Sequence, residues 1–254
     1  MVSTGGNPLF LENLDTGVFT LPTQSGAGDR KSFLILQNII RNFVPHYVYF
    51  EIGSYMGGTL VPHLIDPLCR HVFSIDKRPL TQLDERGVYF DYNANSTKAM
   101  LHALESHVPP SAFLKLTTYD FDVSELSSDQ ISLKANFAFI DAEHTNVAVF
   151  RDFMYTRRFL AEPFMIGFHD ANLTFDGVQN IECLLRYEGV KFKSFFLPDS
   201  VFVILTGDLA NISCQSLERF SVDRETFIHA SRVALWKQVA ANADLIQGNT
   251  IGHR

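Results

Sequence analysis

Acidic residues end five apolar segments of this 254-residue chain. They are Glu51, Asp76, Asp120, Asp141 and the pair His169-Asp170. Carboxylates and imidazoles can bind a divalent cation, accept hydrogen bonds from ribose hydroxyls, or take a proton from a hydroxyl group. The recurrence of such side chains in one local context carries more weight than any single residue among them.

A glycine-rich stretch, EIGSYMGGT, begins at the first of these acids, Glu51. Glycine has no Cβ, so a loop with three glycines in six residues lets a ligand approach the backbone closely. A GxGxxG loop would need glycine at Tyr55, which disfavours an NAD-dependent dehydrogenase. About two dozen residues after Glu51, Asp76 is placed to bind ribose hydroxyls. The two motifs predict a ligand that contains a nucleoside and is bound without a pyrophosphate-binding loop.

Segments with helical spacing alternate with apolar segments, and these are the elements that must position the acids. Strands are predicted at 47–52, 71–76, 113–120, 135–141 and 163–170. Helices are predicted at 31–43, 58–68 (interrupted near Pro62), 96–107, 145–162 and 177–187. The last two apolar runs, 190–197 and 200–207, flank Pro198-Asp199 and predict an antiparallel hairpin.

The predicted strands are continuously apolar, as expected when helices cover both faces of a sheet. We therefore predict an α/β fold: a doubly wound, mostly parallel, seven-stranded sheet with a C-terminal antiparallel hairpin. Ligands bind at the carboxyl ends of the strands in such a sheet. The acids that end the five parallel strands should then line one edge and form one pocket.

We expect three parts along the chain. Residues 1–30, rich in Gly, Thr and Ser, are expected to be loosely ordered or to act as a lid. Residues 31–220 are expected to form the ligand-binding domain. Residues 221–254 carry a helical pattern that includes Phe227, Ile228 and Trp236, and we expect this helix to pack on the domain or on a second subunit.

The composition limits the partners. The chain has 28 acidic and 21 basic residues, a formal charge of −7 and no cluster of Lys and Arg, so neither nucleic acid nor a membrane surface is expected to bind. No apolar stretch approaches the roughly 18 residues that a membrane span needs. Cys69, Cys183 and Cys214 are widely spaced and are interpreted as core residues of a cytoplasmic protein. A small-molecule partner is the expectation.

The motifs EIGSYMGGT, VFSID, FAFIDAEH and IGFHDAN resemble class I S-adenosylmethionine-dependent methyltransferases, specifically the small metal-dependent O-methyltransferases related to catechol O-methyltransferase. The resemblance covers about residues 47–207. It implies a Rossmann-like methyltransferase fold with S-adenosylmethionine as cofactor, so that 31–220 would be the cofactor-binding domain. By resemblance, the methionine part of the cofactor would lie on Glu51, Gly53, Ser54, Tyr55 and Gly57 to Thr59, including Gly58. Asp76 would bind the ribose, and Asp120 and Phe121 would lie against the adenine.

The resemblance also implies a divalent metal, with Mg²⁺ favoured because the implied ligands are mostly hard oxygens. Asp141 would be a metal ligand close to the transferred methyl group, and Asp170 would complete the site. The family usually places an asparagine or an acid directly after the second aspartate, whereas this chain has Ala171 there. His169 or Asn172 could therefore be the third ligand, with His169 preferred, or the metal could be absent.

His144 stands three residues after Asp141, where the catechol enzymes carry a lysine that acts as the general base. A histidine can accept a hydroxyl proton near neutral pH without the large pKa depression that lysine requires. The expected activity is therefore O-methylation of a small-molecule hydroxyl on a sugar, a natural product or a catechol-like diol, with His144 as the base.

Two other functions stay open at the level of the sequence. His144, His169 and Asp170 could supply the two-histidine, one-carboxylate site of a non-heme iron oxygenase. The chain could also be a catalytically silent protein that binds S-adenosylmethionine. A homo-oligomer formed through the C-terminal helix is a further expectation.

Overall fold

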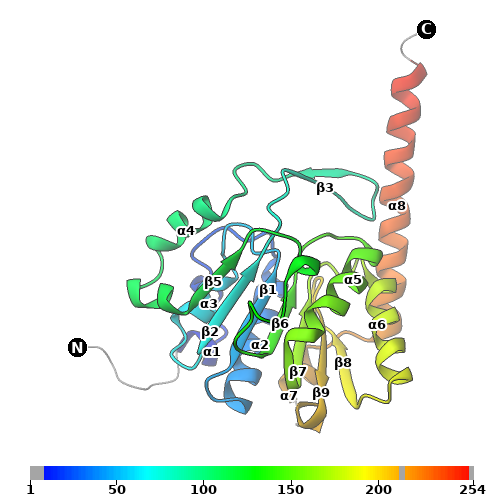
Figure 1. Ribbon diagram of the computed structural model, residues 1–254. Helices are drawn as coiled ribbons and strands as arrows, with labels where there is room; N and C mark the ends of the chain where they lie inside the picture. The colour runs from blue at the N-terminus through cyan, green and yellow to red at the C-terminus, as the bar shows by residue number, and fades with distance from the viewer. Residues whose placement is uncertain (1–8, 212–214, 252–254) are drawn as a thin grey trace.

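The structure is a computed structural model that describes residues 9–211 and 215–251. Its main sheet has seven strands in the order β5-β2-β1-β6-β7-β9-β8 (Figure 1). Their bounds are β5 Leu116–Tyr119, β2 His71–Ile75, β1 Val48–Ile52, β6 Ala135–Ile140, β7 Leu160–Phe168, β9 Phe202–Thr206 and β8 Phe192–Phe196. The first five are mutually parallel, and β9 pairs antiparallel with both β7 and β8. The predicted fold class, including the C-terminal hairpin, is confirmed.

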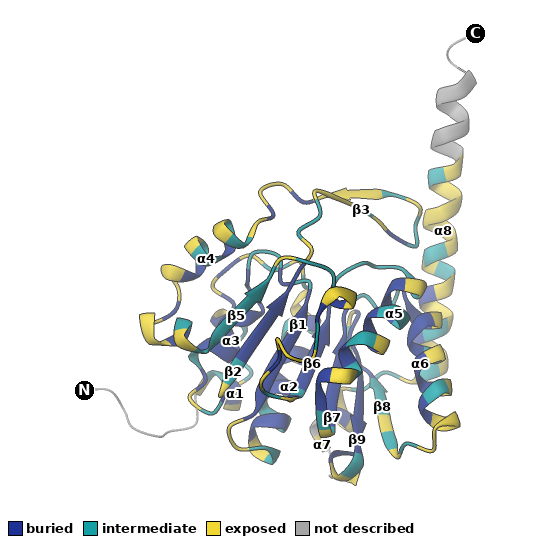
Figure 2. Ribbon diagram, viewed as in Figure 1, coloured by how far each residue is buried: buried dark blue, intermediate teal, exposed yellow. Residues whose placement is uncertain are grey.

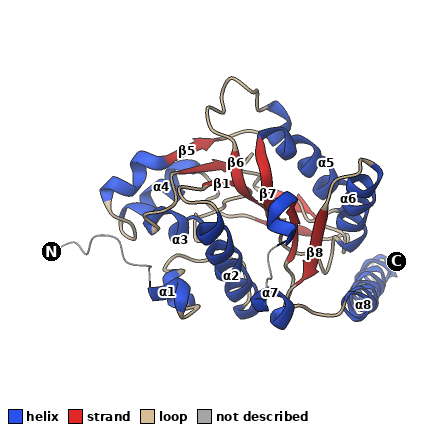
Figure 3. Ribbon diagram, turned by 90° about the horizontal axis from the view of Figure 1, so that it is seen from below, coloured by secondary structure: helices blue, strands red, loops and turns tan. Residues whose placement is uncertain are grey.

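Two apolar layers sandwich the sheet, because alternate residues of each strand point to opposite faces. Tyr49 of β1 lies in one buried cluster with residues of α2 (Ala27–Phe43), α3 (Leu60–Ile65), α4 (Thr97–Glu105) and α7 (Gln215–Phe220). Phe50 lies in the other with residues of α5 (Asn146–Thr156), α6 (Phe175–Tyr187) and α8 (Arg224–Ile251). Figure 3 shows the two groups of helices on opposite sides of the strands. All five residues of β1 are buried, which explains its continuous apolar character.

Prolines explain two differences from the predicted bounds. The strand predicted at 113–120 begins only at Leu116, because a 3₁₀ helix that starts at Pro110 takes up the preceding residues. The helix predicted to be interrupted near Pro62 is continuous from Leu60 to Ile65. Pro62 lies in its first turn, where a helix needs no backbone N–H donor.

The helix predicted at 145–162 ends at Thr156, and one 3₁₀ turn, Arg157–Phe159, leads directly into β7. Leu160 already pairs with Ala135 of β6, so sheet pairing replaces helical hydrogen bonds from this residue. The helical spacing before Thr156 did not indicate the residue at which sheet pairing replaces the helix.

A small hairpin was not predicted. It consists of β3 (Thr81–Leu83) and β4 (Tyr89–Asp91), which pair antiparallel beyond the carboxyl end of β2. A turn joins them in which Asp84 accepts a hydrogen bond from the N–H of Arg86 at 2.8 Å. Figure 2 shows that most of the hairpin is exposed. Its short strands therefore have no buried apolar face to give a pattern in the sequence.

A segment near each end of the described chain contacts the domain. Leu11, Phe19 and Leu21 are buried in the core ahead of α2. Phe227 of α8 stacks on Phe196 with ring centroids 4.4 Å apart, but the side chain of Trp236 is 67% exposed. Figure 1 shows α8 passing the sheet and continuing beyond it. The division at residues 30 and 220 stays a prediction.

No helix in the described ranges is long and apolar enough to cross a membrane. Cys69 is buried, as predicted for a core residue, whereas Cys183 is exposed on α6. The prediction for Cys183 was therefore wrong, because its position on the helix faces away from the sheet. Cys214 lies outside the described residues.

Candidate functional site

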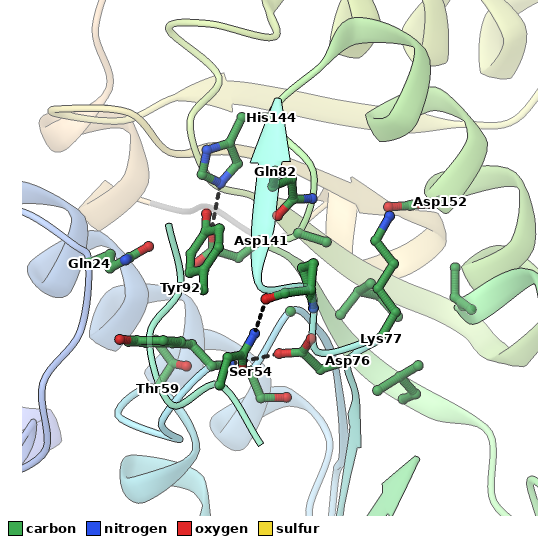
Figure 4. Close-up of a pocket in the computed structure, with 18 of the residues that line it drawn as sticks. Gln24, Ser54, Thr59, Asp76, Lys77, Gln82, Tyr92, Asp141, His144 and Asp152 are labelled. Atoms are coloured by element: carbon green, nitrogen blue, oxygen red, sulfur yellow. Dashed lines mark hydrogen bonds and ion pairs between the residues drawn. The ribbon is translucent and has the colours of Figure 1, made fainter. Parts of the chain in front are cut away.

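A pocket that is partly open to solvent lies at the carboxyl ends of β1, β2 and β6 (Figure 4). The predicted site residues that line it are Gly53, Ser54, Tyr55, Gly58, Thr59, Asp76, Phe121, Asp141 and His144. Glu51, Asp120, His169 and Asp170 are not part of this lining and are described separately below.

The glycine loop, residues 53–58, follows β1 directly. Gly53 has a φ of +87°, and a Cβ at this position would overlap the carbonyl oxygen of Asp141. Its N–H donates to the carbonyl of Ile75 at 2.8 Å. Glycine is therefore required where the ends of β1, β2 and β6 meet. A Cβ on Gly58 would lie 2.7 Å from the carbonyl oxygen of Pro22, so the segment before α2 also closes on this loop.

Glu51 supports the glycine loop from within the core. Its carboxyl group is fully buried and accepts hydrogen bonds from the hydroxyls of Tyr49 at 2.6 Å and Thr59 at 2.5 Å. Burial raises its pKa to about 8, although these two hydrogen bonds favour the ionised form. The cradling role that the resemblance gave to Glu51 stays a prediction. Its hydrogen bonds connect β1 to Thr59, the residue that precedes α3.

Asp76 faces the pocket at the end of β2 and has partners on both carboxylate oxygens. It accepts hydrogen bonds from the N–H of Tyr55 at 2.9 Å and from the N–H of Arg78 at 2.7 Å. The Arg78 guanidinium lies 3.2 Å from the same carboxylate. Tyr55 has a φ of +43°, and Asp76 holds this backbone in place. The carboxylate thus joins the glycine loop to the end of β2.

Of the two residues after β5 that were predicted to contact adenine, only one lines the pocket. Phe121 lines the pocket, whereas Asp120 is exposed and accepts a hydrogen bond from the Thr97 hydroxyl. Asp122 lines the pocket instead, 3.7 Å from Arg151 of α5. A carboxylate two residues further along the loop therefore faces the cavity, and the sequence offered no signal to choose between the two.

Asp152 of α5 is a second acid in the wall that sequence reasoning missed. Burial raises its pKa to about 6, against the opposing effect of Arg151, whose guanidinium lies 2.9 Å away. Lys77, also in the wall, lies 3.1 Å from Glu143. The two basic residues of the wall are therefore already in ion pairs.

A second group of side chains lies where β6 and β7 end. We call Asp141, His144, His169 and Asp170 the acid–histidine cluster. Asp141, His144 and Asp170 each offer a ligand atom, and these atoms lie within 4.8 Å of one another. The Nε2 of His144 is 3.1 Å from Asp170 and 3.6 Å from Asp141. Asp170 has a φ of +49°, which turns its side chain back toward β6.

His169 lies behind these residues and is almost fully buried. Its Nδ1 is 3.0 Å from Asp141 and 3.2 Å from Asp170. Its Nε2 is 3.3 Å from Asp29, a residue of α2. Neither nitrogen has a partner with hydrogen-bond geometry within the described residues. The structure thus brings together all four predicted residues of this cluster and adds Asp29.

The charges of the cluster shift the pKa of its members. Burial lowers the pKa of His144, but Asp141 and Asp170 outweigh burial and raise it above its ordinary value. Burial also opposes ionisation of Asp141 and Asp170, yet the neighbouring histidines lower the pKa of both carboxyls. These shifts therefore favour positive charge, either protons or a cation, between the carboxylates.

Asn172 is the alternative to His169 as a third ligand. Its Oδ1 is buried and has no hydrogen-bond partner among the described residues. The backbone of the preceding residue, Ala171, donates to the carbonyl of Ser200 at 2.8 Å. This contact ties the loop after β7 to the turn between β8 and β9.

Two segments cover the pocket. The first belongs to residues 1–30, for which a lid was one of two expectations, and the second, the β3–β4 region, was not predicted. Residues 22–25 contribute Gln24, and the β3–β4 region contributes Gln82 and Tyr92 (Figure 4). The Nε2 of Gln82 is buried without a hydrogen-bond partner in the described part of the chain. The hairpin is attached to the loop that carries His144, since the N–H of Glu85 donates to the His144 carbonyl at 3.1 Å.

By sequence, the chain matches no family model and no curated protein. By structure, it is similar to an O-methyltransferase from Bacillus cereus solved with S-adenosylhomocysteine, with 13% identity, a TM-score of 0.52, and 80% of this chain and 92% of the other covered. It is also similar to TomG, an O-methyltransferase of tomaymycin synthesis from Streptomyces achromogenes solved with S-adenosylmethionine, with 11% identity, a TM-score of 0.50, and the same 80% and 92% covered. The chain therefore has the fold of class I S-adenosylmethionine-dependent methyltransferases.

Proposed function

We propose that this protein is an S-adenosylmethionine-dependent O-methyltransferase that acts on a small-molecule hydroxyl group with the help of a divalent cation. One observation carries the proposal: a single pocket joins the glycine loop and Asp76 to Asp141 and His144. Methyl transfer needs this proximity, because an oxygen nucleophile must be aligned with the sulfonium methyl group. The shared fold with cofactor-bound methyltransferases supports the same assignment.

The cofactor would lie along the glycine loop, because Gly53, Tyr55 and Gly58 of this loop line the pocket. Asp76 would accept hydrogen bonds from the ribose while its contacts to Tyr55 and Arg78 hold the carboxylate in place. Phe121 offers an apolar surface for the adenine ring. These residues bind and orient the cofactor, and none of them needs to exchange a proton.

The acid–histidine cluster fits a divalent cation by its donor set. It offers two carboxylates and two imidazoles, and both nitrogens of buried His169 lack hydrogen-bond partners among the described residues. A bound cation would supply Lewis acidity that lowers the pKa of the acceptor hydroxyl. Asp141 and Asp170 would hold it with one histidine nitrogen. His144, which lines the pocket, would accept the hydroxyl proton on Nε2.

The acceptor would be a neutral hydroxylated molecule such as a sugar or another polyol. In the wall, Arg151 pairs with Asp122 and Asp152, and Lys77 pairs with Glu143, so neither of these two basic side chains is left to bind an anionic acceptor. The side chain of Gln82, whose Nε2 has no partner in the described chain, offers a hydrogen bond to an acceptor oxygen. An acceptor that carries phosphate or carboxylate groups is disfavoured.

Calorimetric titration with S-adenosylhomocysteine tests the proposal on wild type and Asp76→Ala. We expect binding by wild type and a loss of at least 10-fold in affinity for the variant. Asp84→Ala is a matched control, because Asp84 is also a buried acid that accepts from the N–H of an arginine two residues later, yet it is not part of the pocket lining. No binding by wild type, or equal losses in both variants, would contradict the cofactor site.

Turnover distinguishes the proposal from its rivals. With a polyol acceptor, His144→Gln should lose roughly 10²- to 10⁴-fold in rate and keep its affinity for S-adenosylhomocysteine. Cofactor binding with no turnover on any acceptor would identify a silent binding protein. Iron-dependent oxygen uptake without cofactor affinity would identify an oxygenase.

A further inference from the structure

The buried ring of His169 lies between two carboxylates on one side and a single carboxylate on the other. The side chain is 4% exposed, and its two nitrogens face opposite ways. Nδ1 faces Asp141 and Asp170, and Nε2 faces Asp29. An imidazole held in this way has one nitrogen for a cation and one N–H for a carboxylate behind it.

The position of Asp29 does not depend on His169. Its Oδ1 accepts hydrogen bonds from the N–H and the hydroxyl of Ser200 at 2.8 and 2.9 Å. Its Oδ2 accepts from the N–H of Gly26 at 2.9 Å and also faces the imidazole. The Ser200 carbonyl in turn accepts from the N–H of Ala171, next to the cluster. Asp29 is therefore a fixed negative group, supplied by α2 and held by the β8–β9 turn.

The distances on the other side of the ring suit a metal ion. Nδ1 lies 3.0 Å from Oδ1 of Asp141 and 3.2 Å from Oδ2 of Asp170. Adjacent ligands of an octahedral ion with bonds of about 2.1 Å lie roughly 3 Å apart. Ligating histidines usually donate their other N–H to a carboxylate or carbonyl, which fixes the tautomer and the orientation of the ring.

We propose that His169 is the nitrogen ligand of the divalent cation through Nδ1, and that Asp29 is the positioning residue that accepts its Nε2–H. This inference rests on the proposed function and decides between the two histidines of the cluster. His144 lines the pocket and keeps its nitrogen for the acceptor proton, whereas His169 has no access to it. Because imidazole favours transition metals over Mg²⁺, the site should bind Mn²⁺ more tightly than Mg²⁺.

Calorimetric titration with Mn²⁺ on wild type, Asp29→Asn and Asp199→Asn tests the positioning role. Asparagine at position 29 can still accept from Ser200 but lacks the charge that holds Nε2–H. We expect a 10- to 100-fold loss of Mn²⁺ affinity in Asp29→Asn. Asp199→Asn should keep wild-type affinity, because Asp199 bonds to Gly28 in the same contact between α2 and the turn and is not an ion-pair partner of His169. Equal affinity in all three proteins would overturn the inference.

Pulsed EPR of Mn²⁺-loaded His144→Ala tests the ligand without changing Asp29. We expect coupling to one imidazole nitrogen, which His169→Gln should abolish. Loss of this coupling in His144→Ala would show that His144 is the ligand and would refute the proposal.

Titration with S-adenosylhomocysteine on the same samples separates this inference from the proposed function. Cofactor binding by a wild type that takes up no Mn²⁺ would leave the methyltransferase assignment standing and overturn only the metal ligand. In that case His169 would be a buried cation shared by three carboxylates. Mn²⁺ binding without cofactor binding would overturn the methyltransferase assignment and leave the metal ligand standing.

Discussion

The glycine loop and the acid–histidine cluster lie at the same edge of the sheet but satisfy their polar groups differently. Around the glycine loop, Glu51 and Asp76 already have hydrogen-bond donors from the protein on both carboxylate oxygens. In the cluster, Asp141 and Asp170 face His169, whose two nitrogens have no partner with hydrogen-bond geometry among the described residues. The first region is preorganised by its own contacts, whereas the second is arranged around a positive charge that must come from protons or a cation.

The largest effect should come where the two regions meet. Gly53→Ala places a methyl group against the Asp141 carbonyl at a φ of +87°, so we expect binding of S-adenosylhomocysteine to fall below detection. Gly87→Ala is the control, because its φ is +73° but no atom lies within 4 Å of the added Cβ. It should cost only about 1 kcal/mol of stability. Calorimetry measures the binding and thermal unfolding measures the stability of both variants. Intact binding in Gly53→Ala would show that the loop does not need the close contact between Gly53 and the Asp141 carbonyl.

Asp170→Asn should affect the cluster and leave the glycine loop intact. Asparagine tolerates the φ of +49° at this position, so the backbone should be retained. In wild type, Mn²⁺ at about 100 times its Kd should stabilise the fold by about 2.7 kcal/mol. We expect most of this gain to disappear in the variant, while stabilisation by S-adenosylhomocysteine stays. Thermal unfolding with each ligand measures the two effects, and loss of both would mean that the regions are coupled.

Glu51→Gln should affect the glycine loop through pH. Burial raises the pKa of Glu51 from 4.5 to about 8, so between these values the unfolded chain is ionised at this residue and the folded chain is not. The unfolded state then binds fewer protons, and wild-type stability falls as pH rises through this window. The variant lacks this contribution. Its free energy of unfolding should therefore rise relative to that of wild type by up to roughly 1 kcal/mol for each unit of increasing pH. Urea unfolding from pH 5 to 8 measures the difference, and parallel profiles would refute it.

The smallest effect should come from the cover of the pocket. Asn242 of α8 donates to the Arg86 carbonyl at 3.0 Å, and Asn242→Ala removes this contact between α8 and the hairpin. A hydrogen bond of this kind contributes about 1 kcal/mol. We expect KM for the acceptor to rise a few-fold with Mn²⁺ affinity unchanged. Steady-state kinetics measure this, and a large change in Mn²⁺ affinity would mean that α8 also positions the cluster.

The sheet and most of the site could be predicted because buried parallel strands leave a strong local signal. Continuous apolar runs identified the strands, and an acid after each run identified the edge that Asp76 and Asp141 share. The β3–β4 hairpin gave no such signal, because it is held by a turn and by contacts to distant loops and not by a buried face. Its contribution of Gln82 and Tyr92 could therefore not be predicted.

The order of the elements and the residues that end them can be predicted from the amino-acid sequence alone. Helical spacing, apolar runs and glycine positions act over a few residues, so they can be recognised without knowing the fold. Packing in three dimensions places Asp29 behind His169, brings Asp122 and not Asp120 to the pocket, and buries Glu51 beneath the loop. These relations depend on how segments distant along the chain pack together and on which side chains that packing removes from water.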